Sequence, residues 1–125
     1  MTRYEALLSE YDHLDIQEKP MKNEGLYCDG SIWINKGLVE SKKACILAEE
    51  IGHYETSFGD IINRKDMTSV KQEYAARKWA YKKLLPFEEV MAAIGCGFTK
   101  PHEIAEYLCV DEAFLRECLK YYRLL

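Results

Sequence analysis

The chain of 125 residues is long enough for one domain, and its 48% hydrophobic and 30% charged residues are typical of a globular protein with a single core. A net charge of −4 argues against general affinity for phosphate backbones, and no run of about 18 apolar residues exists that could cross a membrane. Because the first residues are polar and acidic rather than basic and apolar, no secretory signal is expected, and the protein is predicted to be cytoplasmic.

The first third of the chain contains a helix signal followed by two strand signals. Apolar residues at i, i+3, i+4 and i+7 predict an amphipathic helix over residues 2–14. Farther on, two β-prone runs, GLYC and SIWIN, flank an Asp-Gly dipeptide, which is typical of two-residue hairpin turns. These runs predict a β-hairpin, and we expect the side chains of Ile32, Trp33 and Ile34 to pack in the core.

The rest of the chain is predicted to be helical. Apolar periodicity and the positions of Gly and Pro predict helices over 41–55, 68–84, 86–94, 101–108 and 111–123, with a loop or short turn at 60–68. This pattern predicts an α+β fold, a mostly helical single domain with a small antiparallel sheet or hairpin and a C-terminal helical pair. We expect residues 1–98 to form the core and residues 99–125 to pack on it as a helix-turn-helix-like pair.

The charge of two segments bears on possible partners. Between Thr99 and Leu125 four basic residues stand against five acidic ones, so direct DNA binding by the C-terminal pair is not expected. Between Arg64 and Lys83, by contrast, seven basic residues stand against two acidic ones. This basic stretch is either a solvated helix face or a docking surface for an acidic partner.

The segment KKACILAEEIGH carries the candidate chemistry. On a helix its small and apolar residues form one stripe, whereas Glu49, Glu50 and His53 lie on roughly the opposite side. Glu49 and His53 are i, i+4 neighbours, so their side chains can converge on one divalent metal, and Glu50 could act as a general base. Alternatively, the three polar residues are the solvated face of an amphipathic helix.

Two further features favour the metal site over the solvated face. Gly52 is costly inside a helix, by about 1 kcal/mol relative to Ala, which indicates close approach by another element. Glu73 lies on the next long predicted helix, from which its carboxylate could supply a third ligand.

At these positions the chain resembles the ImmA/IrrE family of metallopeptidases, which occurs in phages and mobile elements. The resemblance covers most of the chain, from GLYCDGSIWIN through LAEEIGHYETSFGDI to the EYAARKWAYKKLLP helix. It implies a zincin-like fold in which one helix bears an H-E-x-x-H zinc motif and the following helix supplies a glutamate. By this correspondence Glu49 takes the place of the first histidine, Glu50 that of the general base and His53 that of the second histidine. Glu73 fits the third ligand.

The chain departs from the family motif because Glu49 stands where the first histidine is expected. A carboxylate can bind zinc at about 2.0–2.2 Å, so Glu49, His53 and Glu73 could still coordinate a metal. One imidazole with two carboxylates is a harder donor set, which would bind zinc less selectively and could accept manganese or another divalent metal. Candidate donors to an oxyanion are Tyr54, Tyr74 and His102.

The resemblance implies a metal-dependent endopeptidase that cleaves a helix-turn-helix repressor of a prophage or mobile element. It also implies an edge strand beside the cleft, for which SIWIN is the candidate, and an extended substrate could pair with that edge. The glutamate at the first motif position leaves a second function open, namely a catalytically degenerate protein that binds a repressor or a toxin–antitoxin partner.

Overall fold

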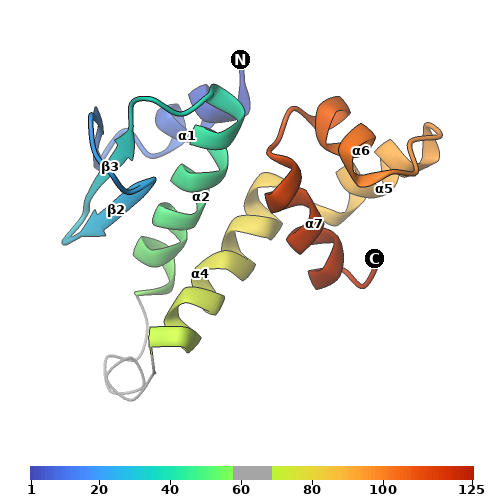
Figure 1. Ribbon diagram of the computed structural model, residues 1–125. Helices are drawn as coiled ribbons and strands as arrows, with labels where there is room; N and C mark the ends of the chain where they lie inside the picture. Colours follow the sequence, from blue (N-terminus) through green and yellow to red (C-terminus); the bar gives the residue numbers. More distant parts are fainter. Residues whose placement is uncertain (58–68) are drawn as a thin grey trace.

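The computed structural model describes residues 1–57 and 69–125, and within these ranges it contains six helices and a three-stranded sheet (Figure 1). The strands are β1 (Asp15–Lys19), β2 (Gly25–Cys28) and β3 (Ser31–Asn35). The helices are α1 (Arg3–Glu10), α2 (Glu40–Thr56), α4 (Ser69–Leu84), α5 (Phe87–Gly95), α6 (Pro101–Leu108) and α7 (Glu112–Tyr121). The mostly helical α+β fold is confirmed, and the loop predicted at 60–68 lies outside the described residues.

Local signals explain where most of these elements begin and end. The Thr2 hydroxyl accepts from the backbone N–H of Glu5, whose carboxylate accepts in return from Thr2, so a capping box starts α1. The Asp111 carboxylate caps α7 in the same way by accepting from the N–H of Phe114. The helix predicted over 2–14 is wrong at its end, because α1 stops at Glu10 and the chain turns into β1.

The sheet has the order β1-β3-β2, with β1 parallel and β2 antiparallel to β3. The hairpin of β2 and β3 is confirmed, and its two turn residues have the positive φ angles, 47° and 83°, that such a turn requires. The predicted small antiparallel sheet or hairpin corresponds to the β2–β3 pair, and β1 adds a parallel strand that the sequence did not predict. The expectation that SIWIN is an edge strand is wrong, because β3 is central and β2 forms the edge.

Side chains alternate between the two faces of β3. Ile32 and Ile34 are fully buried against the helices, as predicted, whereas Trp33 points to the opposite face and is 42% exposed. The expectation that Trp33 packs in the core is therefore wrong. Its ring instead lies under the ammonium group of Lys19, 5.3 Å from the ring centroid.

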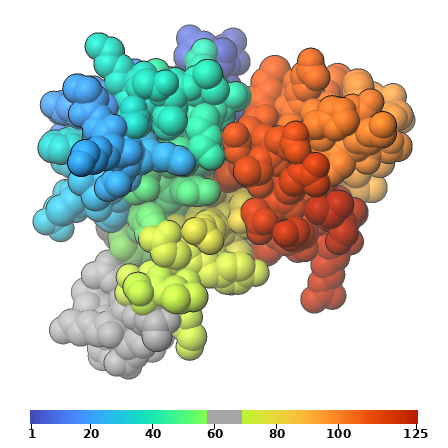
Figure 2. Space-filling model, in the orientation of Figure 1, coloured from blue at the N-terminus to red at the C-terminus, as the bar shows by residue number. Residues whose placement is uncertain are grey.

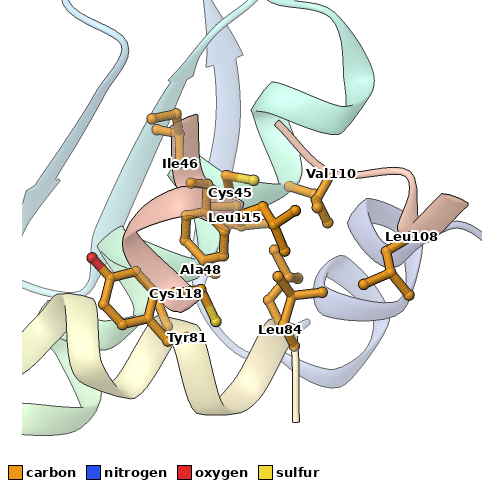
Figure 3. Packing of buried hydrophobic residues seen from close by; sticks show 14 of the residues in the cluster. Cys45, Ile46, Ala48, Tyr81, Leu84, Leu108, Val110, Leu115 and Cys118 are labelled. Carbon is orange, nitrogen blue, oxygen red and sulfur yellow. The ribbon is translucent and has the colours of Figure 1, made fainter. Parts of the chain in front are cut away.

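Helix α2 is the centre of the molecule, contacting α1, α4, β2 and β3 (Figure 1). Its predicted apolar stripe of Ala44, Leu47, Ala48 and Ile51 is buried. The C-terminal pair packs on this core, because residues of α6 and α7 belong to the same buried cluster as those of α2 and α4. Figure 3 shows Leu115 and Cys118 lying beside Cys45 and Ala48. None of the helices in the described ranges is long and apolar enough to cross a membrane.

Candidate functional site

Helices α2 and α4 approach each other closely at Gly52. A Cβ atom placed on Gly52 would lie 2.4 Å from the backbone oxygen of Ala76, a separation that real Cβ atoms do not reach. Ala76 is itself fully buried, so two small residues let the helix backbones come together. The expectation that another element approaches Gly52 closely is confirmed.

This close packing brings His53 and Glu73 into contact. The Nε2 atom of His53 lies 3.2 Å from Oε1 of Glu73 across the α2–α4 interface. The imidazole is mostly buried, with 22% of its side chain exposed, whereas the carboxylate is 54% exposed. Two of the residues predicted as metal ligands are therefore adjacent and reachable from solvent.

Glu50 lies on the side of α2 that faces β2. A Cβ atom on Gly25 would be 3.2 Å from Cγ and 3.4 Å from Oε1 of Glu50, so the strand backbone runs directly beside this carboxylate. Burial raises the pKa of Glu50 to about 7, and the negative charges of Glu49 and Glu73 act in the same direction. The side chain is therefore a carboxyl group poised to exchange a proton near neutral pH.

Tyr27 is a site neighbour that the sequence did not predict. It lies two residues after Gly25 on the same face of β2, and its ring is parallel to that of His53, with centroids 6.5 Å apart and planes 6° from each other. Thus one strand contacts both Glu50 and His53. The two-residue spacing of Gly25 and Tyr27 is the only sequence signal of this arrangement, and it becomes informative once β2 is known to lie against α2.

Glu49 is placed one helical turn away from His53, in a different setting. It lines a pocket of about 260 Å³ between α2, α4 and α7, together with Lys42, Arg77 and Glu117 and an apolar floor. Burial raises the pKa of Glu49, while the positive charges of Arg77 and Lys42 oppose that shift. The negative charges of Glu24 and Glu73 add to the effect of burial, so the pKa of Glu49 stays raised despite the nearby cations.

Two of the three predicted donors are placed to bind a divalent metal. An imidazole nitrogen and a carboxylate oxygen in contact are two donors that a zinc or manganese ion accepts. Across residues 1–57 and 69–125, no three His, Cys, Asp or Glu side chains are gathered as a metal-binding group, so Glu49 does not join the pair of His53 and Glu73 in this structure. The assignment of Glu49 as a ligand rests on its i, i+4 spacing to His53 and on the resemblance.

The three candidate oxyanion donors lie in different places. The Tyr54 ring contacts those of Tyr27 and His13, with centroids 6.4 and 6.2 Å apart. Tyr74 is half exposed on α4, one residue beyond Glu73. His102 is exposed in the first turn of α6, which packs with α5 and α7. Tyr54 follows His53 on α2 and contacts Tyr27 on β2, whereas Tyr74 follows Glu73 on α4.

The burial of Glu50 predicts a fall in stability of the metal-free protein as pH rises. Its folded-state pKa is about 7 and its ordinary value 4.5, so the folded chain keeps a proton that the unfolded chain has lost between these values. The contribution of Glu50 to the free energy of unfolding should therefore be greatest below about pH 4.5 and fall by about 3 kcal/mol by pH 8. Urea titrations in chelator measure the effect, and Glu50→Gln is expected to decline less than the wild type, because only Glu49 then keeps a raised pKa. A wild-type profile as flat as that of the variant contradicts it.

No protein-family model matches the chain, and no curated protein sequence matches it. The ImmA/IrrE resemblance therefore stays a prediction that depends on the motif helix and on the glutamate of the helix after it. What the structure adds is the contact between those two helices.

Proposed function

We propose that this protein is a metal-dependent endopeptidase of the ImmA/IrrE type, which cleaves a helix-turn-helix repressor of a prophage or mobile element. The observation that carries the proposal is the contact between His53 and Glu73, with half-buried Glu50 one turn before His53 on the same helix. Metal donors and a proton-accepting carboxyl group thus meet on two helices that pack tightly.

The residues would divide the work as follows. His53 and Glu73 would hold a zinc ion, or manganese or another divalent metal, with Glu49 as the third ligand that the resemblance implies. When bound, the ion would supply Lewis-acid polarisation of the scissile carbonyl. Glu50 takes the proton of the attacking water and passes it to the leaving amine. Tyr27 and Gly25 line the strand side of these groups.

The edge of β2 offers a way to position an extended substrate. The N–H of Asn35 donates to the carbonyl of Glu24 at 2.9 Å, which identifies this pair as a hydrogen-bonded pair of the antiparallel ladder. Because such pairs alternate, the N–H and C=O groups of Gly25 and Tyr27 point away from β3. A substrate strand paired with these groups would cross beside Glu50 and His53.

Metal dependence can be tested before any substrate is known. Protein purified without chelator should contain near-stoichiometric metal, and zinc or manganese at about a hundred times its Kd should stabilise the fold by about 2.7 kcal/mol. His53→Ala and Glu73→Gln should lose both effects, whereas His13→Ala, which removes an exposed histidine, should keep them. If no divalent ion raises the melting temperature, the proposed metal site is wrong.

Cleavage is then tested by incubating the metal-loaded protein with the repressor encoded next to its gene. Discrete fragments that disappear with chelator are the expected result.

The alternative function is a catalytically degenerate protein that binds a repressor or a toxin–antitoxin partner. The placement of Glu49 favours it, because that carboxylate lies among Arg77 and Lys42 instead of joining His53 and Glu73. Binding of the repressor without cleavage, unchanged by chelator, would select this alternative.

A further inference from the structure

Helix α4 has the largest net positive charge of the described helices and strands. Between Ser69 and Leu84 there are five basic residues and one acidic residue, so 20 of the 21 acidic residues lie elsewhere. Two of the five basic residues have carboxylate neighbours on other elements. Lys83 pairs with Glu10 at 2.7 Å, and Arg77 lies beside Glu49 in the pocket.

The other cations include Lys78 and Lys82, which are one helical turn apart and are held on aromatic rings. The ammonium nitrogen of Lys78 lies 4.9 Å from the centroid of the Tyr74 ring, and that of Lys82 lies 5.9 Å from the centroid of Tyr121 on α7. Neither lysine takes part in the ion pairs of the described residues. We call these four residues the tyrosine–lysine face.

Its construction differs from that of an ordinary solvated surface. A free lysine side chain loses rotamer entropy when it is fixed by a partner. Contact with a tyrosine ring fixes part of that freedom beforehand, so the two positive charges are already spaced for binding. Tyrosine is also enriched among the residues that dominate binding energy at protein interfaces. Figure 2 shows α4, in yellow, reaching the surface beside α7, in red.

We propose that the tyrosine–lysine face is a docking surface for an acidic segment of a partner protein, with carboxylates one helical turn apart facing Lys78 and Lys82. Charge complementarity is the argument, since this face is positive on a chain whose net charge is −4. A nucleic acid is a poorer fit, because a long polyanion would also meet the acidic remainder of the surface. The proposal does not depend on peptidase activity, and it applies equally to a binding protein.

The test uses a short fluorescein-labelled helical peptide with glutamates one turn apart, followed by anisotropy. The full-length protein should bind it, and a peptide with glutamine at the same positions should not bind. Lys78→Glu with Lys82→Glu should weaken binding about tenfold or more, and added salt should weaken it further. Tyr74→Ala should weaken binding, while Tyr74→Phe, which keeps the ring, should not.

The matched control is the pair Lys22→Glu with Lys36→Glu, which changes net charge equally at exposed positions flanking β2 and β3. If this control loses as much binding as the Lys78 and Lys82 variant, the loss is explained by net charge alone and the proposal is wrong. Failure of the glutamate peptide to bind, or tighter binding of labelled single-stranded DNA through the same lysines, would also overturn it. Far-ultraviolet circular dichroism of each variant verifies that the fold is retained.

Discussion

If the proposed function is correct, Glu50→Gln is expected to abolish cleavage of the repressor while leaving bound metal nearly unchanged. The amide has almost the same shape, so its packing against Gly25 of β2 should persist. It cannot accept a proton from water, and proton transfer by a positioned side chain contributes about 10²–10⁴-fold to rate. Single-turnover cleavage with elemental analysis of the same preparation measures both quantities. Loss of kcat/KM without loss of metal is the result that assigns Glu50 to proton transfer.

Glu49→Ala provides the contrast on the adjacent residue. If Glu49 is a ligand, this variant should lose metal as well as activity, because a donor is removed. If Glu49 only lines the pocket with Arg77 and binds no metal, the variant should retain its metal content. Equal loss of metal in the Glu49 and Glu50 variants would contradict the division of roles between the two carboxylates.

The helices and the hairpin could be predicted because their signals are local. An Asp-Gly turn, capping side chains and apolar periodicity act over a few residues, and the five later helices match the predicted ranges within two residues at each end. Strand β1 was missed because it pairs in parallel with β3, and such pairing depends on contacts distant in sequence. Because β1 pairs with one side of β3, β3 is the central strand. The free edge of the sheet beside α2 is therefore β2.

In the candidate site, too, the features with local sequence signals could be predicted and those that depend on distant contacts could not. The spacing of the motif and the presence of Gly52 indicated that α2 meets another element, and the contact of His53 with Glu73 follows from that packing. Tyr27 could not be predicted, because its role depends on which strand lies against α2. The environment of Glu49 could not be predicted either, since the pocket is closed by α7 from the far end of the chain.

Gly52→Ala is expected to destabilise the protein, although alanine is the better helix former. In an exposed helix interior this change would gain about 1 kcal/mol. Here the added Cβ atom would lie 2.4 Å from the carbonyl oxygen of Ala76, a backbone atom that can move only if α2 and α4 separate. Overpacking of this kind typically costs about 1–3 kcal/mol, so after the helix-propensity gain a net loss of up to about 2 kcal/mol is expected in urea unfolding.

Gly95→Ala is the matched control. Gly95 ends α5, has no positive φ, and a Cβ atom there would have no heavy atom within 4 Å. Its stability should therefore equal or slightly exceed that of the wild type. Separation of α2 from α4 would also pull His53 away from Glu73, so Gly52→Ala should bind zinc more weakly even where it is folded. Wild-type stability and wild-type zinc affinity in that variant would contradict the view that this helix contact builds the site.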